Sequence, residues 1–254
     1  MIRIYIFLLF IFIWVAVVIA DGSPEALPSF LDGGKNGAWI SSRGAVLRAG
    51  VSSRSKITRK TVLGDPVEVL DAKGGRSKVK HISGKTGWVS SDDLSTVWIL
   101  VLKKARVLKF MNGRQEKGKW KIDLGPDPVG DKEMEGSRAP GHYRTPEGEF
   151  YVARHVPRSS FHRAFLLSYP SIHHAEKGLK NGLINKNEYN KIVSAIESRR
   201  VPPQNTKLGS YIEIHGSGTG GKLDWTLGCV ALENKVMDFL WGKVPVGAPV
   251  VILP

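Results

Sequence analysis

The chain begins with one continuous apolar run. After Arg3, residues 4–20 carry no charge. Val18 and Ala20 stand at the −3 and −1 positions of a cleavage site before Asp21, a pattern typical of secretory signal peptides. An uncleaved membrane anchor is the alternative, because the run approaches the length that spans a bilayer. Residues 1–20 therefore predict an exported protein of the periplasm or cell envelope, with the signal either cleaved or retained as an anchor.

Two further segments follow this run. Residues 21–37 are rich in proline and glycine with little periodicity, which predicts a linker. Residues 38–97 alternate apolar and polar positions in short stretches, such as 66–70 and 77–82, with turn residues between them. Strands of this length and spacing predict a small all-β barrel.

Longer strands mixed with helices are expected in residues 98–254. Residues 97–113 read as two strands around a basic turn. In residues 208–216, Ile212 and Ile214 share one face of a strand, and the period-2 rule places His215 on the opposite face. The fold class is therefore mostly β with a few helices.

Two helices interrupt the strands of residues 98–254. Asn185, with Glu188 three positions later, predicts a capping box. Apolar residues then recur with helical spacing at positions 189, 192, 193 and 196. For the second, shorter helix, Asn234 is the expected N-cap and Gly242 the expected stop.

The net charge of the chain limits the classes of molecule that it is expected to bind. The 254 residues carry a net charge of +14, and Arg43, Arg48, Arg54, Lys56, Arg59 and Lys60 crowd the first half of the predicted barrel. Outside the cytoplasm, this positive charge favours binding to anionic cell-wall polymers or membrane surfaces over binding to nucleic acid. The simpler alternative is that the charge only maintains solubility.

Cys229 is the chain's only cysteine, so it cannot form an internal disulfide. An unpaired cysteine in an exported protein indicates an intermolecular bond or a reactive thiol, with an inert buried thiol as the alternative. His215 lies upstream, and a glycine-rich loop separates it from Cys229. This loop can fold back and bring the imidazole to the thiol. The backbone amides of Gly228 and Cys229 are candidates to hold an oxyanion. By contrast, we interpret His173, His174 and Glu176 as a solvated helix face rather than a metal cluster.

Two family resemblances rest on these residues. The segments VLRAGVSSRSKI, GDPVEVL and GKTGWVSSDDL resemble the bacterial SH3-like module of exported wall enzymes. GDKEMEGSRAPGHYRTPEGEFYV, the strand ending in His215-Gly216, and Gly228-Cys229-Val230 resemble the L,D-transpeptidase (YkuD-type) family. That resemblance implies that Cys229 is the nucleophile and His215 the general base and acid. It also implies that the backbone carbonyl of Gly216 orients the imidazole. The expected fold is a small SH3-like β-barrel (38–97) followed by a β-rich catalytic domain (98–254).

The family pattern is Ser-His-Gly-Cys-apolar-Arg or Asn, and this chain departs from it. Leu227 stands in place of the histidine and Ala231 in place of the last polar residue. The family implies a transpeptidase that acts on peptidoglycan stem peptides without a metal or cofactor. Two alternatives stay open: a hydrolase of the same fold, either an L,D-carboxypeptidase or an amidase that cleaves a protein–wall link, and a non-catalytic wall-binding protein.

Overall fold

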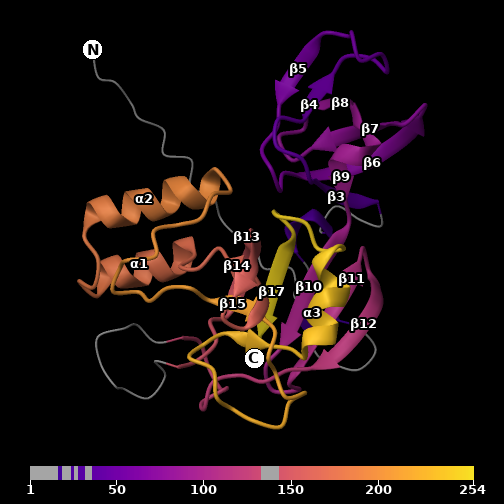
Figure 1. Ribbon diagram of the computed structural model, residues 1–254. Coiled ribbons are helices and arrows are strands. Elements are labelled where there is room, and N and C mark those ends of the chain that lie inside the picture. The colour runs from indigo at the N-terminus through magenta and orange to yellow at the C-terminus, as the bar shows by residue number, and fades with distance from the viewer. Residues whose placement is uncertain (1–16, 19–23, 26–27, 32–35, 133–142) are drawn as a thin grey trace, which may run out of the picture.

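The computed structural model describes residues 17–18, 24–25, 28–31, 36–132 and 143–254. In this part of the chain the fold is mostly β, as expected, with two large sheets and three α-helices (Figure 1). None of the helices in the described ranges is long and apolar enough to cross a membrane. The predicted signal sequence lies outside the described residues except for Val17 and Val18, which form strand β1.

A seven-stranded antiparallel sheet builds the N-terminal module, in the order β5-β4-β8-β7-β6-β3-β9. Alternate residues of β7 and β8 are buried, which matches the alternation in the sequence. The strands are β3 (Gly37–Ile40), β4 (Val46–Arg48), β5 (Ile57–Lys60), β6 (Pro66–Lys73), β7 (Arg76–His81), β8 (Thr86–Ser90) and β9 (Leu94–Ser95), with the 3-10 turn η2 at Ser91–Asp93.

An eight-stranded mixed sheet forms the C-terminal domain, in the order β12-β11-β10-β17-β13-β14-β15-β16. Two of its pairings are parallel, β10 with β17 and β15 with β16. The second of these ends the sheet and carries the candidate site. The strands are β10 (Val97–Leu102), β11 (Val107–Asn112), β12 (Gln115–Lys121), β13 (Gly148–Ser159), β14 (His162–Leu167), β15 (Glu213–His215), β16 (Val230–Ala231) and β17 (Pro249–Leu253).

Three helices flank this sheet (Figure 1). Helices α1 (Ile172–Lys180) and α2 (Lys186–Glu197) enclose a small apolar core of their own, and α3 (Asn234–Trp241) places Phe239 against Phe110 and Trp120 of the sheet. The predicted capping box of α2 is confirmed, with both the Asn185 and the Glu188 side chains bonded to backbone amides.

The predicted cap of α3 is wrong. Glu233 is the N-cap, without a side-chain cap bond, and Asn234 is already helical. The Asn234 side chain instead accepts a hydrogen bond from the Ser217 backbone amide at 2.6 Å. The contact is made across the tertiary fold, and it ties the start of α3 to the loop that follows β15.

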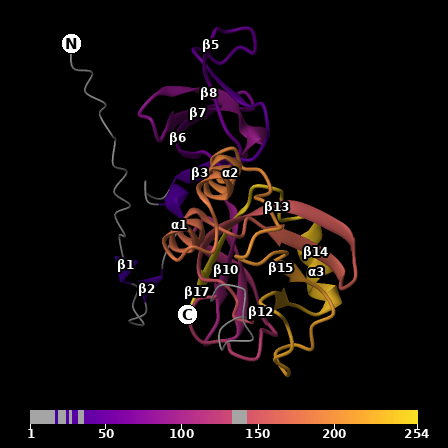
Figure 2. The same cartoon turned by 90° about the vertical axis from the view of Figure 1, so that its left-hand side faces the viewer.

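The module and the C-terminal domain share one apolar core. Trp39 and Leu63 of the module are buried in the same cluster as the central strands of the eight-stranded sheet. The Trp39 indole donates to the Val97 carbonyl at 3.0 Å, and Figures 1 and 2 both show the module seated on one end of the domain. Separating the two would expose this apolar surface to water.

Part of the predicted linker also belongs to this core. Strand β2 (Pro24–Glu25) pairs with β1 (Val17–Val18), and the 3-10 turn η1 (Ser29–Leu31) follows. Within η1, Phe30 and Leu31 are almost fully buried in the shared core. Arg114 of the C-terminal domain donates to the Leu31 carbonyl at 3.0 Å. This short segment therefore packs on the domain rather than simply joining two units.

Candidate active site

Strand pairing brings Cys229 and His215 to one face of the sheet edge. In the parallel pair β15–β16, Ile214 lies opposite Val230 and His215 opposite Ala231. Cys229 directly precedes β16, and its sulfur accepts a hydrogen bond from the Glu213 amide at 3.4 Å. Because side chains alternate along strands, His215 and Cys229 face the same side, and Ile214 faces the core.

His215 is held in one tautomer by a backbone carbonyl. Its Nδ1 lies 2.7 Å from the Gly216 oxygen. A carbonyl can only accept, so Nδ1 carries the proton and Nε2 keeps a free electron pair. The imidazole is 1% exposed, stacked on Phe161 with ring centroids 4.5 Å apart and edge-on to Trp225. Burial lowers the pKa of His215, although the Gly216 bond opposes this. The ring is therefore a neutral base at pH 7.

Cys229 is half-buried, and its thiol donates to the Tyr211 carbonyl at 3.4 Å. Burial raises the pKa of the thiol to about 11. Across the described residues, the sulfur's hydrogen bonds go to the backbone of Glu213 and Tyr211, not to His215. Catalytic contacts are often loose until substrate binds. At rest the site therefore holds a neutral thiol and a neutral imidazole.

Gly228 has a backbone conformation that suits glycine. Its φ is +113°, and an added Cβ would lie 2.9 Å from the Arg144 carbonyl oxygen. The carbonyl of Cys229 accepts from the Thr226 hydroxyl at 2.7 Å. Within the described chain, the amides of Gly228 and Cys229 donate no intramolecular hydrogen bond. The turn thus fixes the backbone around the thiol and leaves two adjacent donors uncommitted.

The loop between His215 and Cys229 closes on a buried carboxylate that sequence reasoning missed. Asp123 accepts from the Thr219 amide and hydroxyl (2.7 and 2.9 Å), the Gly221 amide (2.7 Å) and the Trp225 indole (2.9 Å). Burial alone would raise its pKa, but these four bonds outweigh burial and lower it. Its backbone also pairs with Ala231 in both directions at 3.0 Å. Asp123 therefore ties the glycine-rich loop to the cysteine strand.

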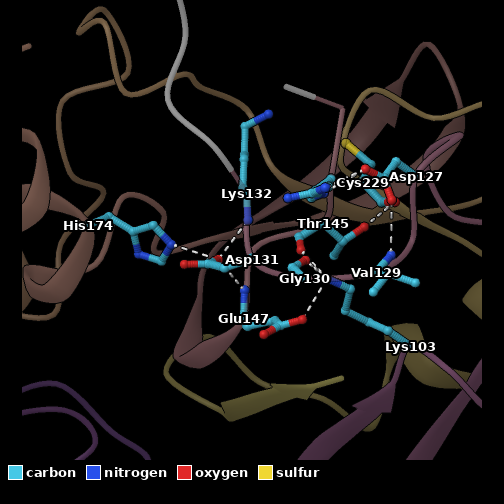
Figure 3. A network of polar contacts seen from close by, with 11 residues as sticks. Lys103, Asp127, Val129, Gly130, Asp131, Lys132, Thr145, Glu147, His174 and Cys229 are labelled. Carbon is cyan, nitrogen blue, oxygen red and sulfur yellow. Dashed lines mark hydrogen bonds and ion pairs between the residues drawn. The ribbon is translucent and has the colours of Figure 1, made fainter. Parts of the chain in front are cut away.

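A second polar network is centred on Asp131, and Figure 3 shows it in the same view as Cys229. Asp131 Oδ1 accepts from the amides of Lys132 (2.7 Å) and Glu147 (2.8 Å) and lies 3.3 Å from His174 Nε2. Although burial opposes it, the His174 contact and these amides bring the pKa of Asp131 down to about 2. The interpretation of His174 as part of a solvated helix face is wrong, because its side chain is 1% exposed. His173 and Glu176 are exposed, as expected.

The two substitutions relative to the family pattern lie in different environments. Leu227, two residues before Cys229, is 65% exposed, and Tyr211, whose backbone carbonyl accepts from the thiol, is 58% exposed. Ala231 is fully buried between the Asp123 backbone and β15, so it cannot contact a substrate. The described residues contain no cluster of three or more histidine, cysteine or carboxylate side chains placed to bind a metal.

Family comparisons agree with this architecture. A model of the L,D-transpeptidase catalytic domain, YkuD, matches residues 96–252. A bacterial SH3 domain model matches residues 43–95. No curated protein matches the chain significantly.

Solved structures show similarity at low sequence identity. An L,D-transpeptidase from Xylanimonas cellulosilytica is 14% identical, with 63% of this chain and 61% of that chain covered and a TM-score of 0.38. Bd1075 from Bdellovibrio bacteriovorus is 21% identical, with coverages of 63% and 48% and a TM-score of 0.41. An L,D-transpeptidase from Mycobacterium tuberculosis is 9% identical, with coverages of 85% and 80% and a TM-score of 0.38. The chain spans less than two thirds of the length of the first two.

Proposed function

Because the chain belongs to the YkuD family of L,D-transpeptidase catalytic domains, we propose that it is an exported cysteine acyltransferase acting on peptidoglycan stem peptides. The observation that carries the proposal is the placement of Cys229 and His215 on one face of adjoining strands. The Gly216 carbonyl, 2.7 Å from Nδ1, leaves Nε2 of the imidazole free to accept a proton.

The proposed reaction starts from the neutral pair. The raised pKa of the thiol and the lowered pKa of the imidazole keep the proton on sulfur until a donor peptide excludes water and draws the two groups together. The proton then moves to His215 Nε2, and the sulfur attacks the carbonyl of the third stem residue. The terminal D-alanine takes the proton and leaves, and an acyl-enzyme remains on Cys229.

The oxyanion of the tetrahedral intermediate needs donors in place before the reaction. The amides of Gly228 and Cys229 are adjacent and uncommitted within the described chain. The Thr226 hydroxyl holds the Cys229 carbonyl at 2.7 Å, which restrains the orientation of this turn. We assign the amides of Gly228 and Cys229 the oxyanion role, a type of contact that commonly contributes about 10²–10³-fold to the rate.

An amine acceptor is favoured over water by the exposed apolar side chains around the thiol. Leu227 lies two residues before Cys229, the Tyr211 backbone carbonyl accepts from the thiol, and both side chains are more than half exposed. We propose that these apolar groups cover the thioester and keep water away from it. Hydrolysis by the same acyl-enzyme is the alternative, as a carboxypeptidase or as an amidase that cleaves a protein–wall link. The presence of His215 on β15 and of Cys229 directly before its partner strand β16 argues against a purely wall-binding protein.

We expect the mature protein, given a disaccharide tetrapeptide and an excess of a D-amino acid or second stem, to form exchanged or cross-linked products. The measurement is separation of products by mass. Tripeptide alone, even at high acceptor concentration, would refute transfer and support hydrolysis. Absence of any product from a folded protein would instead support the wall-binding alternative.

We also propose that the N-terminal module binds anionic wall polymers by charge. Residues 43–60 contain six basic and no acidic side chains. Among these, Arg54, Lys56 and Lys60 are exposed on or beside β5, the edge strand of the module's sheet. Because the module shares its core with the C-terminal domain, deleting it would disturb the whole molecule. The role is better tested by changing surface charge in the full chain.

Reversing two module charges, in the double variant Lys56→Glu with Lys60→Glu, should weaken binding to isolated sacculi several-fold at low salt. Exposed charges are screened over about 8 Å at physiological ionic strength, so the difference should shrink as salt rises. Co-sedimentation measures both effects. The matched control, Lys117→Glu with Lys119→Glu, reverses two exposed charges on β12 of the C-terminal domain. Equal loss in the two double variants would leave only a general charge effect and refute the module's role.

A further inference from the structure

Lys132 is a buried cation next to the nucleophile's backbone. The residue as a whole is only 3% exposed. A Cβ added to Gly228 would lie 3.5 Å from Lys132 Nζ, so the ammonium group occupies the space directly over the residue before Cys229. In Figure 3 the Lys132 side chain extends away from the Asp131 network, and Cys229 is drawn on the right of the same view.

The Asp131 network fixes the backbone of Lys132. Asp131 Oδ1 binds the Lys132 amide at 2.7 Å, and His174 Nε2 on α1 approaches the same oxygen at 3.3 Å. The Glu147 amide donates to that oxygen as well, at 2.8 Å, while the Glu147 carboxylate pairs with buried Lys103 at 2.9 Å. Elements far apart in sequence thus converge on one short turn. A position held this firmly suits a charge that must act at a defined place.

The groups around the sulfur differ in charge. Glu213 lies beside it, and its negative charge acts to raise the thiol pKa. Burial raises the pKa of the Glu213 carboxyl, and the positive charge of Arg154 acts to lower it. His215 is neutral at rest, because burial lowers its pKa. Among the described residues, the positive charge of Lys132 acts on the Cys229 thiol in the opposite direction to Glu213 and lowers its pKa.

We propose that Lys132 is a positioning residue that stabilises the thiolate of Cys229. The proposal deepens the proposed function, since it concerns the same nucleophile. In the attack, the S–H bond breaks, the proton moves to His215 Nε2, and the sulfur electron pair forms the new bond to the acyl carbon. Lys132 neither gains nor loses a proton. Its ammonium group favours the charged sulfur, as an opposite charge nearby favours any ionised group.

The test measures alkylation of the chain's single cysteine by iodoacetamide, a neutral reagent, from pH 7 to 9 in the full protein. Lys132→Met should raise the thiol pKa by about one unit or more. The thiolate fraction then falls about tenfold, and its greater basicity restores part of the rate. A net slowing of about three- to fourfold per unit is expected at every pH in this range. Lys132→Arg should restore the rate, because it returns the charge.

Lys191→Met is the matched control, since it removes an exposed lysine of α2 and should alkylate like the wild type. Should Lys132→Met not fold, Lys132→Gln provides the same neutralisation with a polar side chain. Folded neutral variants that alkylate at the wild-type rate would overturn the proposal, as would an arginine variant as slow as the methionine variant. Alkylation does not depend on peptidoglycan, so these results are independent of whether the stem-peptide reaction is found.

Discussion

Replacing Cys229 by alanine should abolish covalent labelling by a carbapenem and reduce stem-peptide turnover by more than about 10⁴-fold. The chain contains no other cysteine, so no second thiol can substitute. The half-buried Cys229 is a small residue bonded mainly to backbone, so alanine should leave the fold intact. Intact-protein mass spectrometry should show a mass increase of about one carbapenem on the wild type and no increase on Cys229→Ala.

Cys229→Ser is the matched variant for this experiment, because it keeps the size and the hydrogen bonds but is a weaker nucleophile. It should fold like the wild type and label far more slowly. Labelling of Cys229→Ala at a rate like that of the wild type would show that another residue is the nucleophile. A wild-type protein that neither labels nor turns over would support the non-catalytic alternative.

His215→Ala should slow acylation by about 10²–10⁴-fold, the usual contribution of a general acid–base group. Burial lowers the pKa of His215 below the ordinary value of 6.5. As the pH falls through 6.5, the wild-type acylation rate should therefore stay unchanged. It should drop only at the more acidic pH at which the ring becomes protonated. The variant should lose this acidic limb, because the titrating base is gone. Stopped-flow or quenched mass measurements of acylation against pH give both the rate and the profile.

His173→Ala is the control for this change, since His173 is an exposed histidine on α1. It should acylate like the wild type at every pH. His215→Ala removes a ring stacked on Phe161, so its melting temperature must be compared with that of His215→Gln, which fills more of the space. Acylation at the wild-type rate in a folded His215→Ala protein would exclude the proposed base.

Local patterns predicted local structure well. The capping box of α2 is formed because Asn185 and Glu188 lie within one helical turn and need no distant partner. The alternation in β7 and β8 reports burial for the same reason, since each strand has one covered face. The single Cys229 and the short spacing to His215 likewise marked the candidate site, because both residues lie on one loop and its flanking strands.

Contacts between distant segments were outside the reach of such patterns. Asn234 has the residue type of an N-cap, but Ser217 of the site loop binds its side chain and the helix starts one residue earlier than that role requires. His174 has the spacing of an exposed helix face, yet Asp131, 43 positions away, meets it inside the fold. Asp123 carried no sequence signal, because the three residues that donate its four hydrogen bonds lie about a hundred positions further along the chain.

The amino-acid sequence by itself determined the order of the two β-rich units, the reactive residue types and the family. Tertiary structure alone decided what surrounds the thiol. The parallel pairing of β15 and β16 puts Cys229 on the face of His215. The Asp123 and Asp131 networks place the site loop and Lys132 around them. The physical reason is that periodicity and capping depend on neighbours a few positions away. Burial and long-range hydrogen bonds, which together set the direction of each pKa, depend on which segments the tertiary fold makes adjacent.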